Sequence, residues 1–445
     1  MGRKSRARAL AVWINGKLAG EWRIQARGAR EFQYDPAWIA SGEGRPLSLS
    51  LPATLDNVPI RGSLVVSYFV ILLPDSESIR TRLQGRFQTS SRRAFDLLEA
   101  IGRDCVGAVQ LLPPDESPDG VFEISAQPLT ASRIETALIR TVSPASFAER
   151  PGDDFRISIA GAQEKTAFLR HAGRWCRPLA ATPTTHIFKL PLGRVGRSQA
   201  DMSTSVENEW LCARILKAYG LPVASCEIRK FGSQKVLVIE RFDRQLHSSG
   251  NYWLRLVQED FCQATGTPVA RKYESDGGPG MLEIAAILRN SVNRDGDLAC
   301  LIKAQLLYWM LAAPDGHAKN FSLRILAGGR YQLAPLYDVL SAWPVVGRGA
   351  NKVSRQKLRL AMAIHGKNKH YLVQDIRRRH FNQAAVRCGL GATAEPIIEG
   401  ILAATSRVIA SVQRGVPGRF PQQVLDAILQ GLADSAKRLE AMPAE

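Results

Sequence analysis

The stretch Ala313-Pro-Asp-Gly-His-Ala-Lys-Asn320 spaces Asp315 and Asn320 as D-x-x-x-x-N, and Asp338 follows 18 residues after the asparagine. Phosphoryl transfer needs a carboxylate that accepts a hydroxyl proton, and an Asn and an Asp that hold Mg²⁺ on the phosphates. A hairpin predicted around Gly328-Gly329 puts Asp338 after a strand, where the second metal-binding Asp of such a site belongs. Because Asp-Gly is a common turn and the spacing often arises by chance, an ordinary loop remains the alternative.

A lysine inside an apolar strand is the second candidate. His186-Ile-Phe-Lys-Leu-Pro191 buries Lys189 at a cost unless its ammonium finds an anion. The strand lysine of kinases reaches the α- and β-phosphates of ATP. A lysine at a strand edge that faces water is equally common, but the order Lys189, Asp315, Asn320, Asp338 is the order that kinases use.

Two stretches of small residues invite a phosphate-loop interpretation. The turn from Ser158 to Thr166 lacks the glycine that a Walker A motif has before its lysine. Its backbone N–H groups could still approach phosphates, although the residues alone favour a hairpin turn. The stretch 274–280 follows no predicted strand and contains Pro279, which removes a donor, so we interpret it as a structural loop between helices.

Strand and helix patterns divide the chain into three regions. We predict a mixed β/α N-terminal region at 1–145 with a hairpin at Asn15-Gly16, a β-rich lobe with one helix at 146–248, and an all-helical large lobe at 249–445. A small β-rich lobe followed by a helical one is the bilobal layout of protein-kinase-like α+β folds. The layout alone carries no function.

The charge balance points to an anionic partner. The chain has 445 residues, 45% of them apolar and 22% charged, which excludes a disordered chain, and its net charge is +18. Residues 348–379 hold ten Lys or Arg against Asp375 alone, a local charge of +9. Such a run is either a solvated face or a surface that contacts a nucleic-acid backbone, and both interpretations stay open.

Cysteines and apolar runs point to the cytoplasm. The seven Cys are scattered without a CxxC pair, and HExxH is absent, so we expect reduced thiols and no zinc site. The longest apolar run, 64–73, is shorter than the ~20 residues that a bilayer crossing needs. The basic start lacks a secretory apolar segment, and Arg6 stands where a myristoylation signal has Ser or Thr.

Strings along nearly the whole chain resemble the HipA family, the serine/threonine kinase toxins of HipBA-type toxin–antitoxin modules. In order they are RPLSLSLP (45–52), LLPDS (72–76), the stretch 92–104, RISIAGAQEKTAFLR (156–170), THIFKLP (185–191), ENEW (207–210), IERFDR (239–244), KYESDGGPG (272–280) and DGHAKNFS (315–322). Strings of this length in the same order are very specific. The long N-terminal region resembles that of full-length toxins.

The resemblance implies roles for individual residues. Asp315 would be the catalytic base, and Asn320 and Asp338 would bind Mg²⁺. The ATP site would comprise Ala160, Gly161, Ala162, Gln163, Glu164, Lys165, Lys189, Glu240, Arg241, Phe242, His317, Lys319 and Tyr337. The turn at 160–165 would then be the phosphate loop and not an ordinary hairpin turn. Ser158 would be the autophosphorylation site, whose added charge of roughly −1.5 to −2 ejects that loop.

The resemblance also implies partners. The toxin would phosphorylate a tRNA-charging enzyme such as glutamyl-tRNA synthetase, which causes growth arrest and persistence. A HipB-type helix-turn-helix antitoxin dimer would neutralise it and hold it on operator DNA. The basic region 348–379 would face that DNA, with Arg377, Arg378 and Arg379 as the candidate contacts.

Two features depart from the family pattern, and two other functions stay open. Pro314 precedes the catalytic Asp, and Tyr68 to Ile71 replace a more polar version of the N-terminal motif. A catalytically idle co-repressor scaffold that binds antitoxin and DNA is one alternative. A kinase of small molecules or lipids is the other, although the long N-terminal region favours protein and DNA partners.

Overall fold

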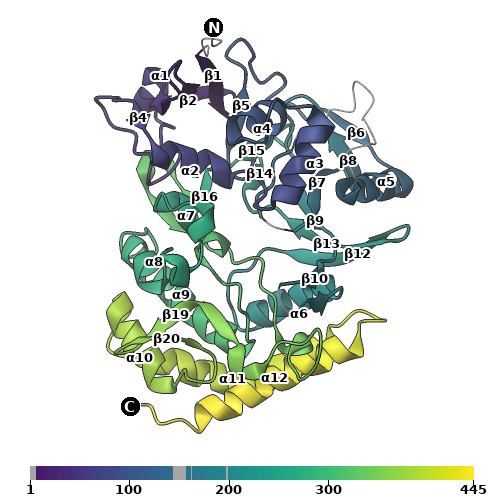
Figure 1. Ribbon diagram of the computed structural model, residues 1–445, viewed down its shortest axis with the longest axis vertical. Coiled ribbons are helices and arrows are strands. Elements are labelled where there is room, and N and C mark those ends of the chain that lie inside the picture. The colour runs from purple at the N-terminus through teal and green to yellow at the C-terminus, as the bar shows by residue number, and fades with distance from the viewer. Residues whose placement is uncertain (1–6, 144–156, 162, 197–198) are drawn as a thin grey trace. The chain divides into compact units, whose positions relative to one another are not determined.

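The computed structural model describes residues 7–143, 157–161, 163–196 and 199–445 (Figure 1). The chain divides into two compact units. The first unit comprises Met1–Leu190, Arg229–Ala270 and Leu323–Tyr331. The second comprises Pro191–Ile228, Arg271–Ser322 and Gln332–Glu445. Both units are discontinuous in sequence, so the division into three regions remains a prediction.

A five-stranded antiparallel sheet begins the first unit, in the order β4-β3-β2-β1-β5. Its strands are β1 (Arg8–Ile14), β2 (Lys17–Ile24), β3 (Arg30–Tyr34), β4 (Ile60–Arg61) and β5 (Val109–Leu112), with α1 (Pro36–Ala40) after β3. Asn15 and Gly16 join β1 to β2 with φ angles of 47° and 82°. These left-handed values suit the two-residue turn that Asn-Gly predicts, so the expected hairpin is confirmed.

Three helices follow β4 in the chain; the first and the third contact the sheet, and the second packs on the third. They are α2 (Ser63–Ile71), α3 (Glu77–Phe87) and α4 (Ala94–Ile101). Trp22 on β2 stacks on Phe69 of α2 with ring centroids 4.1 Å apart, and both side chains are buried. The apolar stretch of α2 is therefore core, which agrees with the absence of membrane-spanning helices among the described residues.

A six-stranded sheet in the order β12-β13-β9-β7-β8-β6 positions the expected nucleotide residues. Its strands are β6 (Ala126–Pro128), β7 (Lys165–His171), β8 (Arg174–Pro178), β9 (His186–Lys189), β12 (Cys226–Phe231) and β13 (Gln234–Glu240), and α5 (Ala131–Val142) covers one face. The described stretch 157–161 makes single parallel bridges, from Ile157 to Asp104 and from Gly161 to Pro74. The hairpin β14 (Arg244–Leu246) and β15 (Trp253–Arg255) follows, then β16 (Gln258–Asp260) and α7 (Phe261–Ala264).

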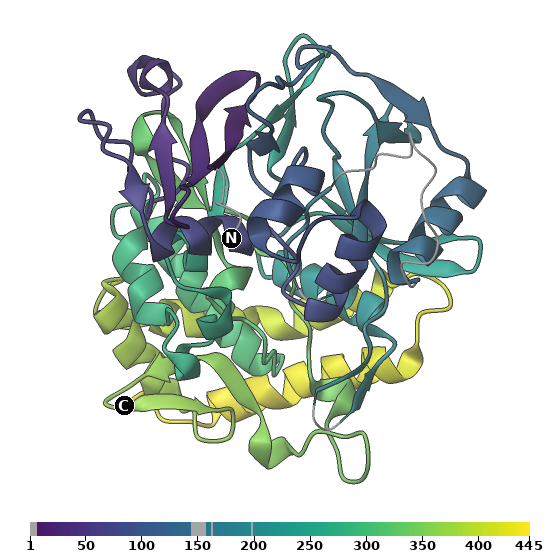
Figure 2. The same cartoon turned by 45° about the horizontal axis from the view of Figure 1, so that its top comes forward.

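The second unit is mostly helical. Its helices are α6 (Ser205–Ala218), α8 (Met281–Leu288), α9 (Arg294–Met310), α10 (Arg378–Cys388), α11 (Glu395–Arg414) and α12 (Gln422–Glu440), with α11 and α12 side by side (Figure 2). The small strands β10 (Gly193–Val195) and β11 (Ala200–Met202) pair before α6. The expected hairpin is present as β17 (Ser322–Ile325) and β18 (Tyr331–Leu333). A second hairpin, β19 (Arg359–His365) with β20 (Lys369–Leu372), lies in the basic region that we expected to be helical.

Candidate active site

The loop that follows α9 in the second unit closes on itself around one carbonyl group. The Asn320 side-chain amide and the His317 backbone N–H both donate hydrogen bonds to the Asp315 carbonyl oxygen, at 2.6 and 2.9 Å. Asn320 and His317 are buried, whereas 49% of the Asp315 side chain is exposed. The loop therefore fixes its backbone internally and leaves the Asp315 carboxylate accessible.

Gly316 follows the aspartate because no side chain fits there. A Cβ atom at this position would lie 2.5 Å from Cδ2 of the buried Tyr308 ring. The Asp-Gly pair is thus explained by packing against α9 as well as by turn formation.

Two aromatic groups adjoin the Asp315 carboxylate. The Tyr273 hydroxyl donates a hydrogen bond to Asp315 Oδ1 at 2.5 Å, and His317 Nε2 lies 3.6 Å from the same oxygen. The rings of Tyr273 and His317 meet edge to face at 5.0 Å. Burial lowers the pKa of His317, and neither ring nitrogen has a hydrogen-bond partner within the described residues. A buried, neutral imidazole of this kind has an N–H to donate to a bound ligand.

Asp338 adopts a backbone conformation that is unusual for a residue with a side chain. Its φ angle is +62°, in the left-handed region, and the residue is half-buried. The neighbouring Tyr337 hydroxyl lies 2.6 Å from Ser322 Oγ and donates to the Lys319 carbonyl at 3.1 Å. Tyr337 thus ties the Asp338 segment to the loop that carries Asp315.

The donors of Asn320 and Asp338 fit Mg²⁺ that arrives with a nucleotide. Asn320 turns its amide nitrogen toward Asp315, which leaves its amide oxygen for a ligand. Mg²⁺ prefers oxygen ligands and commonly takes one or two from the protein and the rest from phosphates and water. An amide oxygen and one carboxylate make a set of that kind.

In the first unit, the turn before β7 brings positive charge together. Lys165 begins β7 and lies directly opposite Lys189 on β9 in the antiparallel register, so both side chains leave the same face of the sheet. A Cβ on Gly161 would lie 2.4 Å from the Lys165 ammonium, which shows how closely that group approaches the turn. Ala162 lies outside the described residues.

The rest of this turn is held by hydrogen bonds. The Gln163 side-chain amide donates to the Leu190 carbonyl at 2.5 Å, and the Leu190 N–H donates to the Glu164 carbonyl at 3.1 Å. The Glu164 carboxylate also forms an ion pair with Arg82 of α3. The expected phosphate loop therefore has a fixed base beside Lys165.

Ser158 is fully buried within the first unit. Its hydroxyl donates to the Leu72 carbonyl at 2.7 Å, and its N–H donates to the Asp104 carbonyl at 3.1 Å. The Asp75 N–H in turn donates to the Gly161 carbonyl at 3.0 Å. Any kinase would have to release this segment before it could phosphorylate Ser158.

The expected adenine segment is partly committed to other contacts. Glu240 pairs with His186 across β13 and β9, and the Arg241 N–H donates to the Thr185 carbonyl at 2.9 Å. The Arg241 guanidinium is buried and donates to Asp243 at 2.7 and 3.0 Å. The Arg241 side chain is thus part of the scaffold within the first unit.

A buried ion network that sequence reasoning missed surrounds Arg241. Its members are Asp104, Asp243, Arg241, Arg244 and Arg255. Burial alone would raise the pKa of Asp104, but the guanidiniums of Arg244, Arg241 and Arg255 outweigh it and hold that pKa far below its usual range. Asp104 also accepts hydrogen bonds from the Thr184 N–H and hydroxyl at 3.0 and 2.6 Å. The network joins the N-terminal region to the segment after β13.

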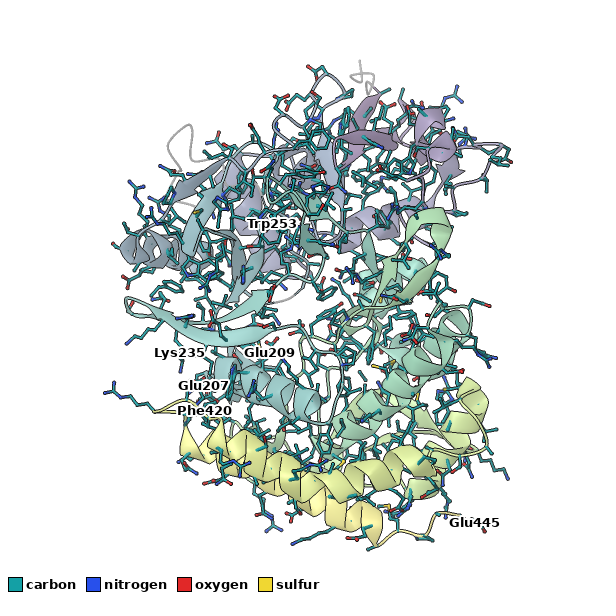
Figure 3. All side chains as sticks on the ribbon, turned by 180° about the vertical axis from the view of Figure 1, so that it is seen from behind. Glu207, Glu209, Lys235, Trp253, Phe420 and Glu445 are labelled. Carbon is teal, nitrogen blue, oxygen red and sulfur yellow. The ribbon has the colours of Figure 1, made fainter. Side chains whose placement is uncertain are left out.

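Helix α6 carries two buried carboxylates, Glu207 and Glu209, which in the sequence stand out only as part of the string ENEW. Figure 3 labels them near Phe420, whose ring lies 5.7 Å from that of Trp210 on the same helix. In kinases a glutamate on the helix after the lysine strand pairs with that lysine. The position of α6 after β9 in the chain was the signal that could have identified them.

The three consecutive arginines of the basic region have different environments. Arg377 and Arg379 are exposed, whereas Arg378 is buried and pairs with Glu395 and Glu399 of α11. Burial, together with the charges of Arg377 and Arg355, lowers the pKa of Arg438, so positive charge accumulates on this part of the second unit. Arg378 holds α10 to α11 and is not placed to contact DNA.

Comparison with known proteins covers most of the chain. The family model described as "HipA N-terminal domain" matches residues 10–112, and "HipA-like C-terminal domain" matches residues 157–409. "Putative kinase Y4mE" of Sinorhizobium fredii is 34% identical over 75% of this chain and 77% of its own length. "Serine/threonine-protein kinase toxin HipA" of Shewanella oneidensis is 28% identical over 69% of each chain.

A solved structure confirms the fold class. A chain in the structure of the Shewanella oneidensis HipA, HipB and operator DNA complex superposes with a TM-score of 0.77 at 23% identity, over 97% of this chain and 98% of that one. The prediction of a kinase-like α+β fold is therefore confirmed.

Proposed function

The chain belongs to the HipA family of kinases, and we propose that it is an ATP- and Mg²⁺-dependent serine/threonine protein kinase that acts as a growth-arrest toxin. The observation that carries this proposal is the arrangement around Asp315 in the second unit. Asn320 closes the loop, the carboxylate stays accessible, and Tyr337 ties Asp338 to the same loop. An idle scaffold has no need of a strained Asp338 or an accessible Asp315.

The first unit would bind the phosphates of ATP. Lys165 and Lys189 share one face of the sheet, and Lys165 is the first residue of β7. Glu240 and Phe242 would offer backbone groups to adenine, and His317 an imidazole N–H to a phosphate.

The chemistry follows from these positions. When bound through Asn320 and Asp338, Mg²⁺ would neutralise negative charge on the phosphates. Asp315 would accept the proton of a serine or threonine hydroxyl, whose oxygen forms a bond to the γ-phosphorus as the bond to ADP breaks. The loop around Asp315 supplies orientation, which is the main contribution that a protein makes to this reaction.

Autophosphorylation at Ser158 would switch the kinase off. The Ser158 hydroxyl is buried and donates to the Leu72 carbonyl, so a phosphate on it would break this hydrogen bond. A phosphoserine carries roughly −1.5 to −2 charges, so it would hold the released segment out of its place beside ATP.

The partners of this kinase would be a HipB-type antitoxin dimer, operator DNA and a protein substrate. The solved Shewanella oneidensis complex combines HipA with HipB and operator DNA, and the exposed Arg377 and Arg379 of this chain suit contact with a phosphate backbone. We propose a tRNA-charging enzyme such as glutamyl-tRNA synthetase as the phosphorylated target, and cytoplasmic action in keeping with it.

Incubation with radiolabelled ATP and Mg²⁺ tests the proposal, with Asp315→Gln and Ser158→Ala compared with wild type. We expect label on the wild-type protein, none on Asp315→Gln, and loss of the labelled peptide from Ser158→Ala. Absence of label from every variant despite ATP binding would favour the idle scaffold. Phosphate release that needs a metal but no Ser or Thr acceptor would favour a small-molecule or lipid kinase.

A further inference from the structure

Tyr273 contacts the Asp315 carboxylate from the start of a loop whose sequence suggests only a structural role. Its hydroxyl donates a hydrogen bond to Asp315 Oδ1, and the two oxygens lie 2.5 Å apart. About half of the Asp315 side chain remains exposed. One carboxylate oxygen therefore has a donor from the protein while the side chain still faces a substrate.

The loop that carries Tyr273 is rigidly held by its neighbour Glu274. The buried Glu274 carboxylate accepts hydrogen bonds from the Ala363 N–H at 2.7 Å, from His365 Nε2 at 3.0 Å and from the Lys369 ammonium at 2.8 Å. All three donors belong to the β19–β20 hairpin. Burial opposes the ionisation of Glu274, but these donors lower its pKa overall. The carboxylate therefore stays charged and keeps its hydrogen bonds to the hairpin.

Close backbone packing explains the glycine at the centre of this loop. The Gly278 N–H donates to the Tyr273 carbonyl at 3.0 Å, and a Cβ on Gly278 would lie 2.0 Å from the Arg271 carbonyl oxygen. The loop thus folds back on the residues that flank Tyr273. It serves to place the tyrosine, and it does not resemble a phosphate cradle.

His317 offers a second donor to the same carboxylate oxygen but stands further away. Its Nε2 atom lies 3.6 Å from Asp315 Oδ1, beyond hydrogen-bond distance, and its ring meets that of Tyr273 edge to face. Tyr273 is therefore the group that fixes the rotation of the carboxylate.

We propose that Tyr273 is a positioning residue, which holds Asp315 through Oδ1 so that Oδ2 receives the proton of the acceptor hydroxyl. This inference rests on the proposed kinase function. In the step, the acceptor O–H bond breaks and its proton passes to Oδ2. The acceptor oxygen bonds to the γ-phosphorus, the bond from that phosphorus to the oxygen of ADP breaks, and ADP keeps the electron pair. The proton on Asp315 then passes to water.

The test compares Tyr273→Phe with Tyr219→Phe. Tyr219 is buried in the same unit and also shares a hydrogen bond, 2.8 Å from its hydroxyl to Thr405 Oγ1, but it lies on the α6–α11 contact. We would measure kcat and the KM for ATP with peptide mixtures that each contain a single Ser, Thr or Tyr acceptor. Because a misplaced carboxylate slows transfer without loosening ATP, we expect kcat to fall about 10- to 100-fold in Tyr273→Phe with KM for ATP within about twofold. Tyr219→Phe should keep both values.

A second variant covers the case in which Tyr273→Phe does not fold. Glu274→Gln weakens the grip of the hairpin on the loop and should lower kcat in the same selective way, by a smaller factor. An unchanged kcat in folded Tyr273→Phe would overturn the inference. A higher kcat would also overturn it, because the tyrosine would then slow the reaction. If the wild-type chain transfers no label, the proposed function is wrong and this inference fails with it. If wild type and Tyr273→Phe are both active at equal rates, only this inference is wrong.

Discussion

Lys165 on β7 lies directly opposite Lys189 on β9, so the two ammonium-bearing side chains leave the same face of the sheet. Like charges at opposite cross-strand positions repel each other, and an anion placed between them relieves that repulsion. The phosphates of ATP are anions that suit this position.

Replacement of either lysine should therefore weaken ATP binding. A hydrogen bond to a charged group contributes about 1.5–3 kcal/mol, so Lys165→Met and Lys189→Met should each raise the Kd for ATP about 10- to 100-fold. Isothermal titration with ATP and Mg²⁺ measures this change. Lys230→Met removes an exposed lysine from β12 and should leave the Kd unchanged. A Kd that stays at the wild-type value in Lys165→Met would remove that lysine from the phosphate site.

The sequence predicts local features of this fold well, because their causes lie within a few residues. Asn15-Gly16 forms the expected turn, and α6 ends just before the Gly-Leu-Pro stretch that begins at Gly220. The D-x-x-x-x-N spacing also identifies the loop of Asp315, since the closing hydrogen bond of Asn320 spans only five residues.

Other features depend on residues that are far apart in the chain. Asp104 meets Arg244 across 140 positions, and Tyr273 meets Asp315 across 42, so no local pattern reveals either contact. The β19–β20 hairpin was missed because β19 is buried at every position after Arg359, so its sequence RLAMAIH lacks the alternation of apolar and polar residues that marks a half-buried strand. A triple arginine likewise gives no sign that its middle member is buried.

The network around Asp104 predicts a large loss of stability on neutralisation. Asp104→Asn leaves three buried guanidiniums with one carboxylate, and the removal of one partner from a buried ion pair costs about 3–5 kcal/mol. Urea denaturation at neutral pH should show this decrease in the free energy of unfolding. Asp115→Asn neutralises an exposed aspartate of the same unit and should change stability little.

Wild type and Asp104→Asn should also differ in how their stability responds to acid. The pKa of Asp104 is lower in the folded than in the unfolded chain, so its contribution to stability is complete above the unfolded value of about 4 and is lost as the pH falls toward the folded value. The difference in unfolding free energy between wild type and Asp104→Asn should therefore shrink below about pH 4. A difference that stays constant down to pH 3 would contradict a charged Asp104.

Substitution of the three arginines at 377–379 should have two different effects, one on DNA binding and one on the stability of the fold. If the basic region contacts operator DNA, Arg377→Ala and Arg379→Ala in the antitoxin complex should each weaken binding and reduce the slope of log K against log salt by about 1. Arg378→Ala should keep that slope but lower the melting temperature, because it breaks the pairs with Glu395 and Glu399. Equal salt slopes in all three variants and wild type would place the DNA surface elsewhere.

Substitution of Asp338 by glycine should increase the stability of the protein and abolish its activity. Its φ of +62° strains a residue with a Cβ, so Asp338→Gly should raise the free energy of unfolding by about 1 kcal/mol while phosphoryl transfer is lost with the carboxylate. Asp338→Asn should lose transfer too, but it should keep wild-type stability because Asn tolerates the same conformation about as well as Asp.

A glycine at another strained position provides the control for these two effects. Ala172, in the turn between β7 and β8, has a φ of +47°, so Ala172→Gly should gain stability and keep full transfer activity. Thermal melts and the labelled-ATP assay on the three variants measure both quantities. An Asp338→Gly protein that is no more stable than Asp338→Asn would show that the surroundings of Asp338 compensate the strain. If Asp338→Gly or Asp338→Asn still transfers phosphate, Asp338 is not part of the metal site, because the reaction then proceeds without its carboxylate.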